Sequence, residues 1–196
     1  MDTSDILAGL VGKRTEGEAL NKAFHEGKIT GLSGLVKRIN FLKGVWLDQI
    51  EAVVAEHDYL RPGAIELFNY FRQHGIVSII ASGSTMQFLS LYQRKLGADY
   101  IVGSRPHMKG DVFGTISARD YSGLDFKIRD SKVILDKLGI AGIDVVAIGD
   151  SPADLGIFKF AGQSIGVNAP DSIAPYVDFL IEDDLARAIP ILEKLR

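Results

Sequence analysis

The sequence predicts an α/β protein in which a parallel sheet follows a small helical cap. Three observations support this fold class. The first part of the chain shows only helical periodicity, whereas short apolar strands alternate with helices after about residue 60. Hydrophobic residues make up 46% of the 196 residues, which is enough for a sizeable core. We therefore predict a helical cap over residues 1–58 and an α/β core over residues 59–196.

Consecutive short helices are expected in the cap. Thr15 and Glu18 have the spacing of a capping box, which predicts a helix that carries Leu20 and Phe24 on one face and ends at Gly27. Apolar residues at spacings of three and four predict two more helices, over residues 32–39 and 46–54.

The core begins with a helix in which Pro62 occupies the first turn and which runs to His74. The remaining pattern predicts, in chain order, a strand at 77–81, a helix to Leu96, a strand at 100–102, a hairpin around 109–111, a helix over 130–138, a strand at 145–148, a helix over 153–161, strands at 165–167 and 179–181, and a final helix. Such alternation is typical of a Rossmann-like parallel sheet with right-handed crossovers, in which ligands bind at the carboxyl ends of the strands.

Composition excludes several functions. The formal net charge is -3, so no basic surplus argues for nucleic acid or an anionic membrane as a partner. No cysteine is present, which excludes disulfides, thiolate metal sites and a cysteine nucleophile. No apolar run has membrane-spanning length and the start does not resemble a signal peptide, so a cytoplasmic protein is expected. A homodimer is left open.

The strongest chemical signal follows the strand at 145–148. That strand delivers Asp150 to the sheet edge, and Asp154 falls in the first turn of the next helix. Magnesium suits two carboxylates placed in this way, because it takes one or two protein carboxylates together with waters and a substrate phosphate oxygen. The alternative is that Asp150 or Ser151 only caps the helix.

A second signal follows the strand at 77–81. Ser82 and Gly83 lie in a turn of small residues that opens a helix, where the Ser82 hydroxyl and backbone N–H groups can hold a phosphate. The alternative is a helix cap by Ser82 or Ser84. A phosphate beside a carboxylate also needs a cation, and Lys127, Arg129 and Lys132 lie near the right point.

These elements in this order resemble the haloacid dehalogenase superfamily, in particular its phosphoserine phosphatase-like branch. The resemblance covers nearly the whole chain. It places Ser82 in the second motif of the family, and Asp150 and Asp154 in the fourth motif, on the magnesium side. For the lysine of the third motif it favours Lys132, with Lys127 as the alternative.

The same resemblance extends to the cap. Residues 25–28 and 37–42 look like the cap of phosphoserine phosphatases, where an arginine at the position of Arg38 grips the substrate carboxylate. Asp2 falls where that branch has a glutamate for the substrate amino group, and the N–H of Gly83 is implied to bind a phosphoryl oxygen. Gly31 departs from the pattern, because phosphoserine enzymes tend to have a bulky apolar residue there.

A larger departure concerns the first motif. The family begins with an apolar strand ending in DxDx[TV], whose first Asp attacks phosphorus and whose second is the general acid and base. This sequence contains no such segment. Its residues 2–5, which include Asp2 and Asp5, follow no strand and are expected to cap the helix that carries Leu7 and Leu10. Because that strand is central in the family's sheet, we expect its two neighbours to have unpaired edges. A first strand lost from the sequence, a strand supplied by a second chain, or a divergent relative would each account for this.

The resemblance implies a magnesium-dependent phosphomonoesterase that acts on a small phosphorylated metabolite, with phosphoserine as the leading candidate. Without the attacking carboxylate, this chain alone is expected to be inactive. The alternative is a non-catalytic module that binds magnesium or phosphate, or that scaffolds a partner.

Overall fold

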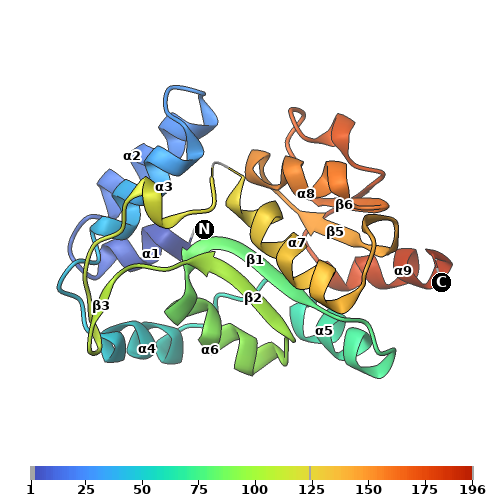
Figure 1. Ribbon diagram of the computed structural model, residues 1–196, viewed down its shortest axis with the longest axis horizontal. Coiled ribbons are helices and arrows are strands. Elements are labelled where there is room, and N and C mark those ends of the chain that lie inside the picture. The colour runs from blue at the N-terminus through green and yellow to red at the C-terminus, as the bar shows by residue number, and fades with distance from the viewer. Residues whose placement is uncertain (1–2, 124, 196) are drawn as a thin grey trace.

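The first part of the chain is helical, as predicted. The computed structural model describes residues 3–123 and 125–195, and in it every named strand follows the helices α1 (Thr3–Gly9), α2 (Arg14–His25), α3 (Gly31–Asn40) and α4 (Leu47–Glu56). These helices lie together on one side of the molecule (Figure 1). The cap boundary at residue 58 stays a prediction.

Helices and parallel strands alternate in the rest of the chain, which confirms the predicted α/β class. The elements are α5 (Ala64–Gln73), β1 (Ile79–Thr85), α6 (Met86–Leu96), β2 (Tyr100–Ser104), β3 (Met108–Lys109), β4 (Val112–Phe113), α7 (Phe126–Leu138), β5 (Val146–Gly149), α8 (Leu155–Phe160), β6 (Gln163–Val167), β7 (Phe179–Ile181) and α9 (Ile189–Leu195). The short β3–β4 hairpin is antiparallel, and it forms where a hairpin was expected.

The parallel strands form two separate sheets. Within the described residues β1 pairs with β2, and β5 pairs with β6, which pairs with β7; β1 and β5 are not paired with each other. Figure 1 shows β1 and β5 on the facing sides of the two sheets. The first five residues of β1 are only half-buried, whereas the last four residues of β6 are buried. The expected pair of unpaired edges is therefore present.

Two predicted helix starts differ from the structure. The residue before α2 is Lys13, which makes no capping bond through its side chain, so the capping box at Thr15 was wrong. Pro62 lies before α5 rather than in its first turn. Gly63 lies between Pro62 and α5. Its φ is +74°, and a Cβ there would collide with the Ala186 backbone, so the position requires glycine.

The cap is attached to the core by apolar packing and by one amide clamp. Leu7 and Ile50 of the cap share a buried cluster with Phe88 of α6. At the end of α3, the Asn40 side chain accepts a hydrogen bond from the Ile116 N–H (2.8 Å) and donates one to the Ile116 carbonyl (2.9 Å). This two-point contact fixes α3 against the segment that precedes α7.

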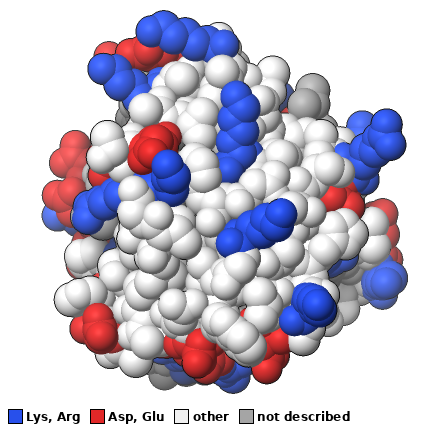
Figure 2. Space-filling view, turned by 90° about the vertical axis from the view of Figure 1, so that its left-hand side faces the viewer, with Lys and Arg blue, Asp and Glu red and all other residues white. Residues whose placement is uncertain are grey.

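Charge on the cap side of the molecule is mixed. In Figure 2, which shows this face, basic and acidic side chains both occur, some of them side by side, with uncharged surface around them. Within the residues that the structure describes, every helix is too short or too polar to cross a lipid bilayer.

Tyr121 links the segment before α7 to the end of β2. Its ring packs edge-on against Phe126, with 4.9 Å between the ring centroids, and its hydroxyl donates to the Ser104 Oγ at 2.7 Å. Burial of the phenol raises the pKa of Tyr121 to about 12.

We expect stability to fall with rising pH in the range where Tyr121 ionises only in the unfolded chain. An unfolded tyrosine titrates near pH 10, and the native one near pH 12. The native state therefore holds more protons between these values, so the free energy of unfolding falls as the pH rises through the window. Urea unfolding at pH 8, 10 and 11 should show that the free energy of unfolding falls less steeply with pH for Tyr121→Phe than for the unmodified chain. Identical slopes would contradict the assignment, and Tyr176→Phe, at a tyrosine 52% exposed, is the matched control.

Candidate active site

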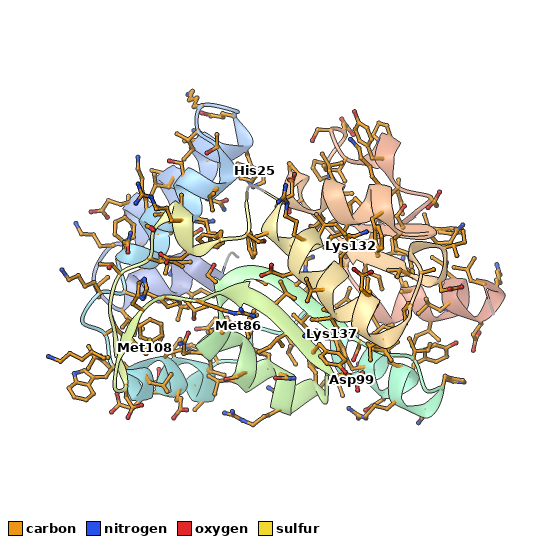
Figure 3. All side chains as sticks on the ribbon, in the orientation of Figure 1. His25, Met86, Asp99, Met108, Lys132 and Lys137 are labelled. Atoms are coloured by element: carbon orange, nitrogen blue, oxygen red, sulfur yellow. The ribbon has the colours of Figure 1, made fainter. Side chains whose placement is uncertain are left out.

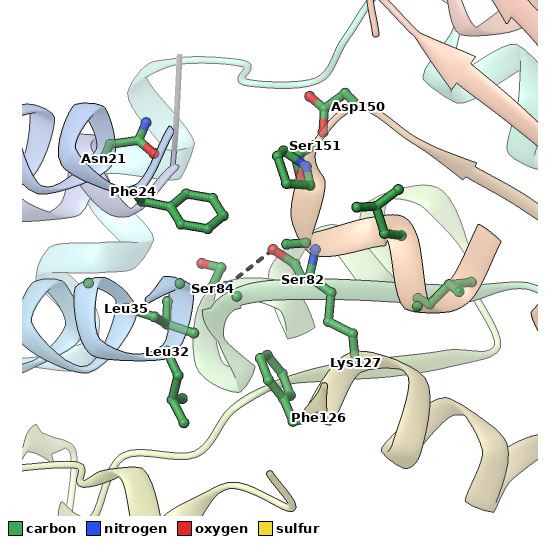
Figure 4. A pocket seen from close by; sticks show the side chains of 18 of the residues that line it. Asn21, Phe24, Leu32, Leu35, Ser82, Ser84, Phe126, Lys127, Asp150 and Ser151 are labelled. Atoms are coloured by element: carbon green, nitrogen blue, oxygen red, sulfur yellow. Dashed lines mark hydrogen bonds between the residues drawn. The ribbon is translucent and has the colours of Figure 1, made fainter. Parts of the chain in front are cut away.

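A large cleft lies between the helices of the cap and the core. Its volume is about 1290 Å³, and it is lined by α2 and α3 on one side and by the ends of β1 and β5 and the start of α7 on the other. Ser82, Lys127 and Asp150 all line it, and Figure 4 shows these three side chains around the same space. The structure thus brings together the three segments that the sequence singled out.

The end of β1 is irregular, and this irregularity presents the serines. The pairing of β1 with β2 shifts register between Ala81 and Thr85, so the intervening residues bulge out of the ladder. Thr85, rather than Ser82 or Ser84, caps α6, because its hydroxyl accepts the N–H of Phe88. The helix-cap alternative for the two serines is therefore wrong.

Both serine hydroxyls remain available to a ligand. The Ser82 Oγ accepts the N–H of Ser84 at 3.1 Å, which leaves its own proton to be donated elsewhere. The Ser84 hydroxyl lines the cleft, is only 3% exposed as a residue, and has no hydrogen-bond partner among the described residues. A buried hydroxyl without a partner costs about 1–3 kcal/mol, which a phosphoryl oxygen in the cleft would offset.

Asp154 holds the loop that follows β5. One of its carboxylate oxygens accepts the N–H groups of Asp150 and Ser151 and the Ser151 hydroxyl, at 3.0–3.2 Å, and the other accepts from Lys127 Nζ at 2.9 Å. A Cβ on Gly149 would lie 2.8 Å from the Asp154 carboxyl carbon, so the strand must end in glycine for this carboxylate to fit. Asp154 therefore shapes the loop, and both its oxygens are already engaged.

The structure favours Lys127 over Lys132 for the cation. Lys127 lies in the first turn of α7 and lines the cleft, and its bond to Asp154 is mostly buried. Lys132 does not line the cleft; its Nζ lies 4.5 Å from the centre of the Phe160 ring, and Figure 3 labels it on the side of α7 toward α8. The structure therefore places Lys127, and not the favoured Lys132, in the cleft, and the catalytic role of this lysine stays a prediction.

Asp150 is an accessible carboxylate at the end of β5. Its side chain is 46% exposed and forms an ion pair with Arg61, which lines the cleft from the opposite loop. Among the described residues no three histidine or acidic side chains cluster closely enough to hold a metal. Magnesium needs fewer, because one or two carboxylates together with waters and a substrate phosphate suffice. The donor set around Asp150 therefore fits that ion only when a phosphate shares it.

The cap contributes a buried cation to the cleft. Arg38 of α3 lines the cleft, is 9% exposed, and lies 3.4 Å (Nη1) from Asp5 Oδ1. Asp5 is thus buried inside α1 as a partner of Arg38 rather than placed as a helix cap. Asp2, the expected contact of a substrate amino group, lies outside the described residues.

An aromatic ring fills the space that Gly31 leaves. A Cβ on Gly31 would lie 3.0 Å from the edge of the Phe24 ring, and both residues line the cleft. Figure 4 shows Phe24 extending from α2 toward the core side of the cleft. Phe24 of α2 therefore provides the apolar side chain that position 31 lacks.

Sequence reasoning missed the parts played by Ser84, Asp5 and Phe24. Ser84 was considered only as a helix cap, although a second hydroxyl two residues after Ser82 was visible in the sequence. Asp5 and Phe24 gave no local signal, because their positions depend on how α1 and α2 pack against α3.

Parallel α/β sheets whose strand ends meet a helical cap, with hydroxyls, a lysine and a carboxylate in the cleft between them, are typical of one class of hydrolase-like proteins. The chain belongs to one family of that class: the model of the haloacid dehalogenase-like hydrolases matches residues 6–159.

Relatives in this family are phosphoserine phosphatases. That of Methanocaldococcus jannaschii is 29% identical over 192 residues, which cover 92% of this chain and 85% of the relative. That of Albidiferax ferrireducens is 27% identical over 183 residues, which cover 91% and 77%. A solved structure of a substrate-bound phosphoserine phosphatase complex is 25% identical and superposes with a TM-score of 0.84, over 97% of this chain and 90% of that one.

We expect loss of the Lys127–Asp154 pair to destabilise the protein. The two side chains are 15% and 11% exposed, so either one left alone is a largely buried charge. Asp154→Asn should lower the free energy of unfolding by about 3 kcal/mol, and the double variant with Lys127→Met should lose less than the sum of the two. Urea unfolding measures this cycle, with the exposed pair Lys13–Glu16 as the matched control, where removing either charge should have little effect on the free energy of unfolding. Additive losses at the buried pair would refute the coupling.

Proposed function

We propose that this chain carries the phosphate-binding and metal-binding parts of a phosphomonoesterase that acts on a small phosphorylated metabolite. The observation that supports it most is that Ser82, Lys127 and Asp150 line one cleft together with Arg38 of the cap. Phosphoserine is the leading candidate for the substrate, because the relatives named above are phosphoserine phosphatases.

The core side of the cleft would bind the phosphoryl group. The hydroxyls of Ser82 and Ser84 and the N–H of Gly83 would donate to its oxygens, and Lys127 would supply a positive charge beside them. A phosphate there brings two negative charges close to Asp150, so a further cation is needed for both to be held together.

Asp150 would hold that cation, with magnesium proposed as the natural ion. When bound, magnesium would draw charge from the phosphoryl oxygens and neutralise the adjacent carboxylate. Asp154 would keep the loop in place through its bonds to the Asp150 and Ser151 N–H groups. In this structure Asp150 forms an ion pair with Arg61, and this pair would break when the cation binds to the carboxylate.

The cap side would recognise the rest of the ester. Arg38 is a buried guanidinium, which suits a substrate carboxylate, and Asp5 holds it in place. The Phe24 ring would cover the organic part of the substrate. Both features fit a compact ester that carries its own negative charge.

Hydrolysis through an aspartyl-phosphate, the route that the resemblance implies, also requires a carboxylate that attacks phosphorus, and we propose that this sequence does not contain it. No DxDx[TV] segment occurs in the 196 residues. Among the residues that the structure describes, the acidic ones that line the cleft are Asp58, Asp125 and Asp150, of which Asp58 is paired with Lys95 at 2.9 Å. The unpaired edges of β1 and β5 would receive an additional parallel strand whose carboxyl end reaches the cleft.

A second candidate function is a module that binds phosphate or magnesium without hydrolysis. The absence of a DxDx[TV] segment and the ion pair between Arg61 and Asp150 favour this alternative. It predicts that phosphate still binds, and that no added strand produces turnover.

We expect turnover only when a strand with the nucleophile is added. Phosphate release from O-phosphoserine with Mg²⁺ should be absent for this chain and should appear when an apolar strand ending in DxDxT is joined to its N-terminus. Replacing the first Asp of that strand by Asn is the matched control and should abolish the activity, as should Asp150→Asn. Turnover by the unextended chain would refute the missing-nucleophile proposal. Phosphate binding without turnover by the extended chain would favour the binding module.

We expect Phe24 to select for the organic part of the ester. Phe24→Ala should weaken phosphoserine binding about five-fold, because loss of apolar contact is worth about 1 kcal/mol, and should leave inorganic phosphate within about two-fold. Isothermal titration calorimetry gives both dissociation constants. Phe41→Ala, at a ring that does not line the cleft, is the control. Equal weakening of both ligands by Phe24→Ala would contradict a role in selectivity.

A further inference from the structure

A chain of hydrogen bonds runs from Tyr121 to the mouth of the cleft. The Tyr121 hydroxyl lies 2.7 Å from Ser104 Oγ, and Ser104 Oγ lies 2.7 Å from the Gly83 carbonyl oxygen. The peptide that begins with this carbonyl ends in the N–H of Ser84, which lies 3.1 Å from Ser82 Oγ. Figure 4 shows the final bond, between Ser84 and Ser82.

The direction of every bond in this chain is fixed by chemistry. A carbonyl only accepts, so Ser104 must give its single proton to Gly83, and Tyr121 must therefore donate to Ser104. The Ser84 N–H only donates, so Ser82 Oγ accepts it and keeps its own proton for another acceptor. All the donors thus point from Tyr121 toward the cleft.

This arrangement has two physical effects on Ser82. The peptide between Gly83 and Ser84 is held at its carbonyl and at its N–H, which limits its rotation. Each group that accepts a hydrogen bond also becomes a better donor to the next, so the chain strengthens the Ser82 hydroxyl as a donor. Ser104 is fully buried, and because burial raises the pKa of Tyr121, its phenol keeps at neutral pH the proton that it donates to Ser104.

We propose that Tyr121 and Ser104 are positioning residues for phosphate binding, which act by orienting and polarising the Ser82 hydroxyl. Neither of them lines the cleft, so they act only through Gly83, Ser84 and Ser82. This inference rests on the proposed function, because it assigns the acceptor of the Ser82 proton to a phosphoryl oxygen. The Tyr121 ring packs on Phe126, directly before Lys127, so the same residue also connects the serine and lysine sides of the cleft.

The test is a double-mutant cycle on phosphate affinity. Inorganic phosphate is titrated calorimetrically into the full chain and into Tyr121→Phe, Ser82→Ala and the double variant at pH 7. Tyr121→Phe should weaken binding about five-fold in the unmodified background and should have no further effect after Ser82→Ala. Ser104→Ala breaks the same chain at its next member and should reproduce this pattern, which keeps the test decisive if Tyr121→Phe does not fold. Tyr176→Phe, at an exposed tyrosine, should change nothing.

The outcomes separate a failure of the positioning role from a failure of the proposed function. Equal weakening by Tyr121→Phe in both backgrounds would mean general loosening and would overturn the positioning role. Unchanged affinity of both Tyr121→Phe and Ser104→Ala would overturn it as well, while leaving the proposed function in place. Failure of the unmodified chain to bind phosphate would overturn the proposed function, and this inference with it.

Discussion

The buried pair between Lys127 and Asp154 fixes the relation between the two halves of the cleft. The two parallel sheets share no hydrogen bonds, so their relative position depends on the helices that pack against them. Helix α7 packs against β1 and β2 and also against α8. Its Lys127 then binds the carboxylate that organises the loop after β5. One polar contact therefore connects the serine side of the site to the Asp150 side.

The sequence predicted the order of elements well because the signals involved are local. Buried apolar runs marked β2, β5, β6 and β7 to within about two residues, and helical spacing found α3 and α4. Helix ends were less accurate, because the bonds that cap them depend on how the chain enters the helix. Thr15 had suitable neighbours in the sequence, yet α2 already begins at Arg14.

The different placement of the two lysines has the same origin. The expected helix over residues 130–138 begins instead at Phe126, which adds about one turn at its start. Lys127 thereby enters the first turn and faces Asp154, whereas Lys132, five residues later, is rotated by about 140° around the helix axis. Contacts between distant segments, such as Phe24 with Gly31 or Tyr121 with Ser104, left no mark in the local pattern. They arise only when the helices and strands pack together.

The close approach at Gly149 has a consequence for how this family can vary. A methyl group there would press on the Asp154 carboxyl carbon from 2.8 Å and disturb the bonds to Lys127 and to the loop N–H groups. Selection for a folded protein alone would then preserve this glycine, even in a lineage that had given up hydrolysis. A glycine that never varies at this position would therefore reflect steric need, and an exposed position of the site such as Asp150 would be the better record of whether catalysis was retained.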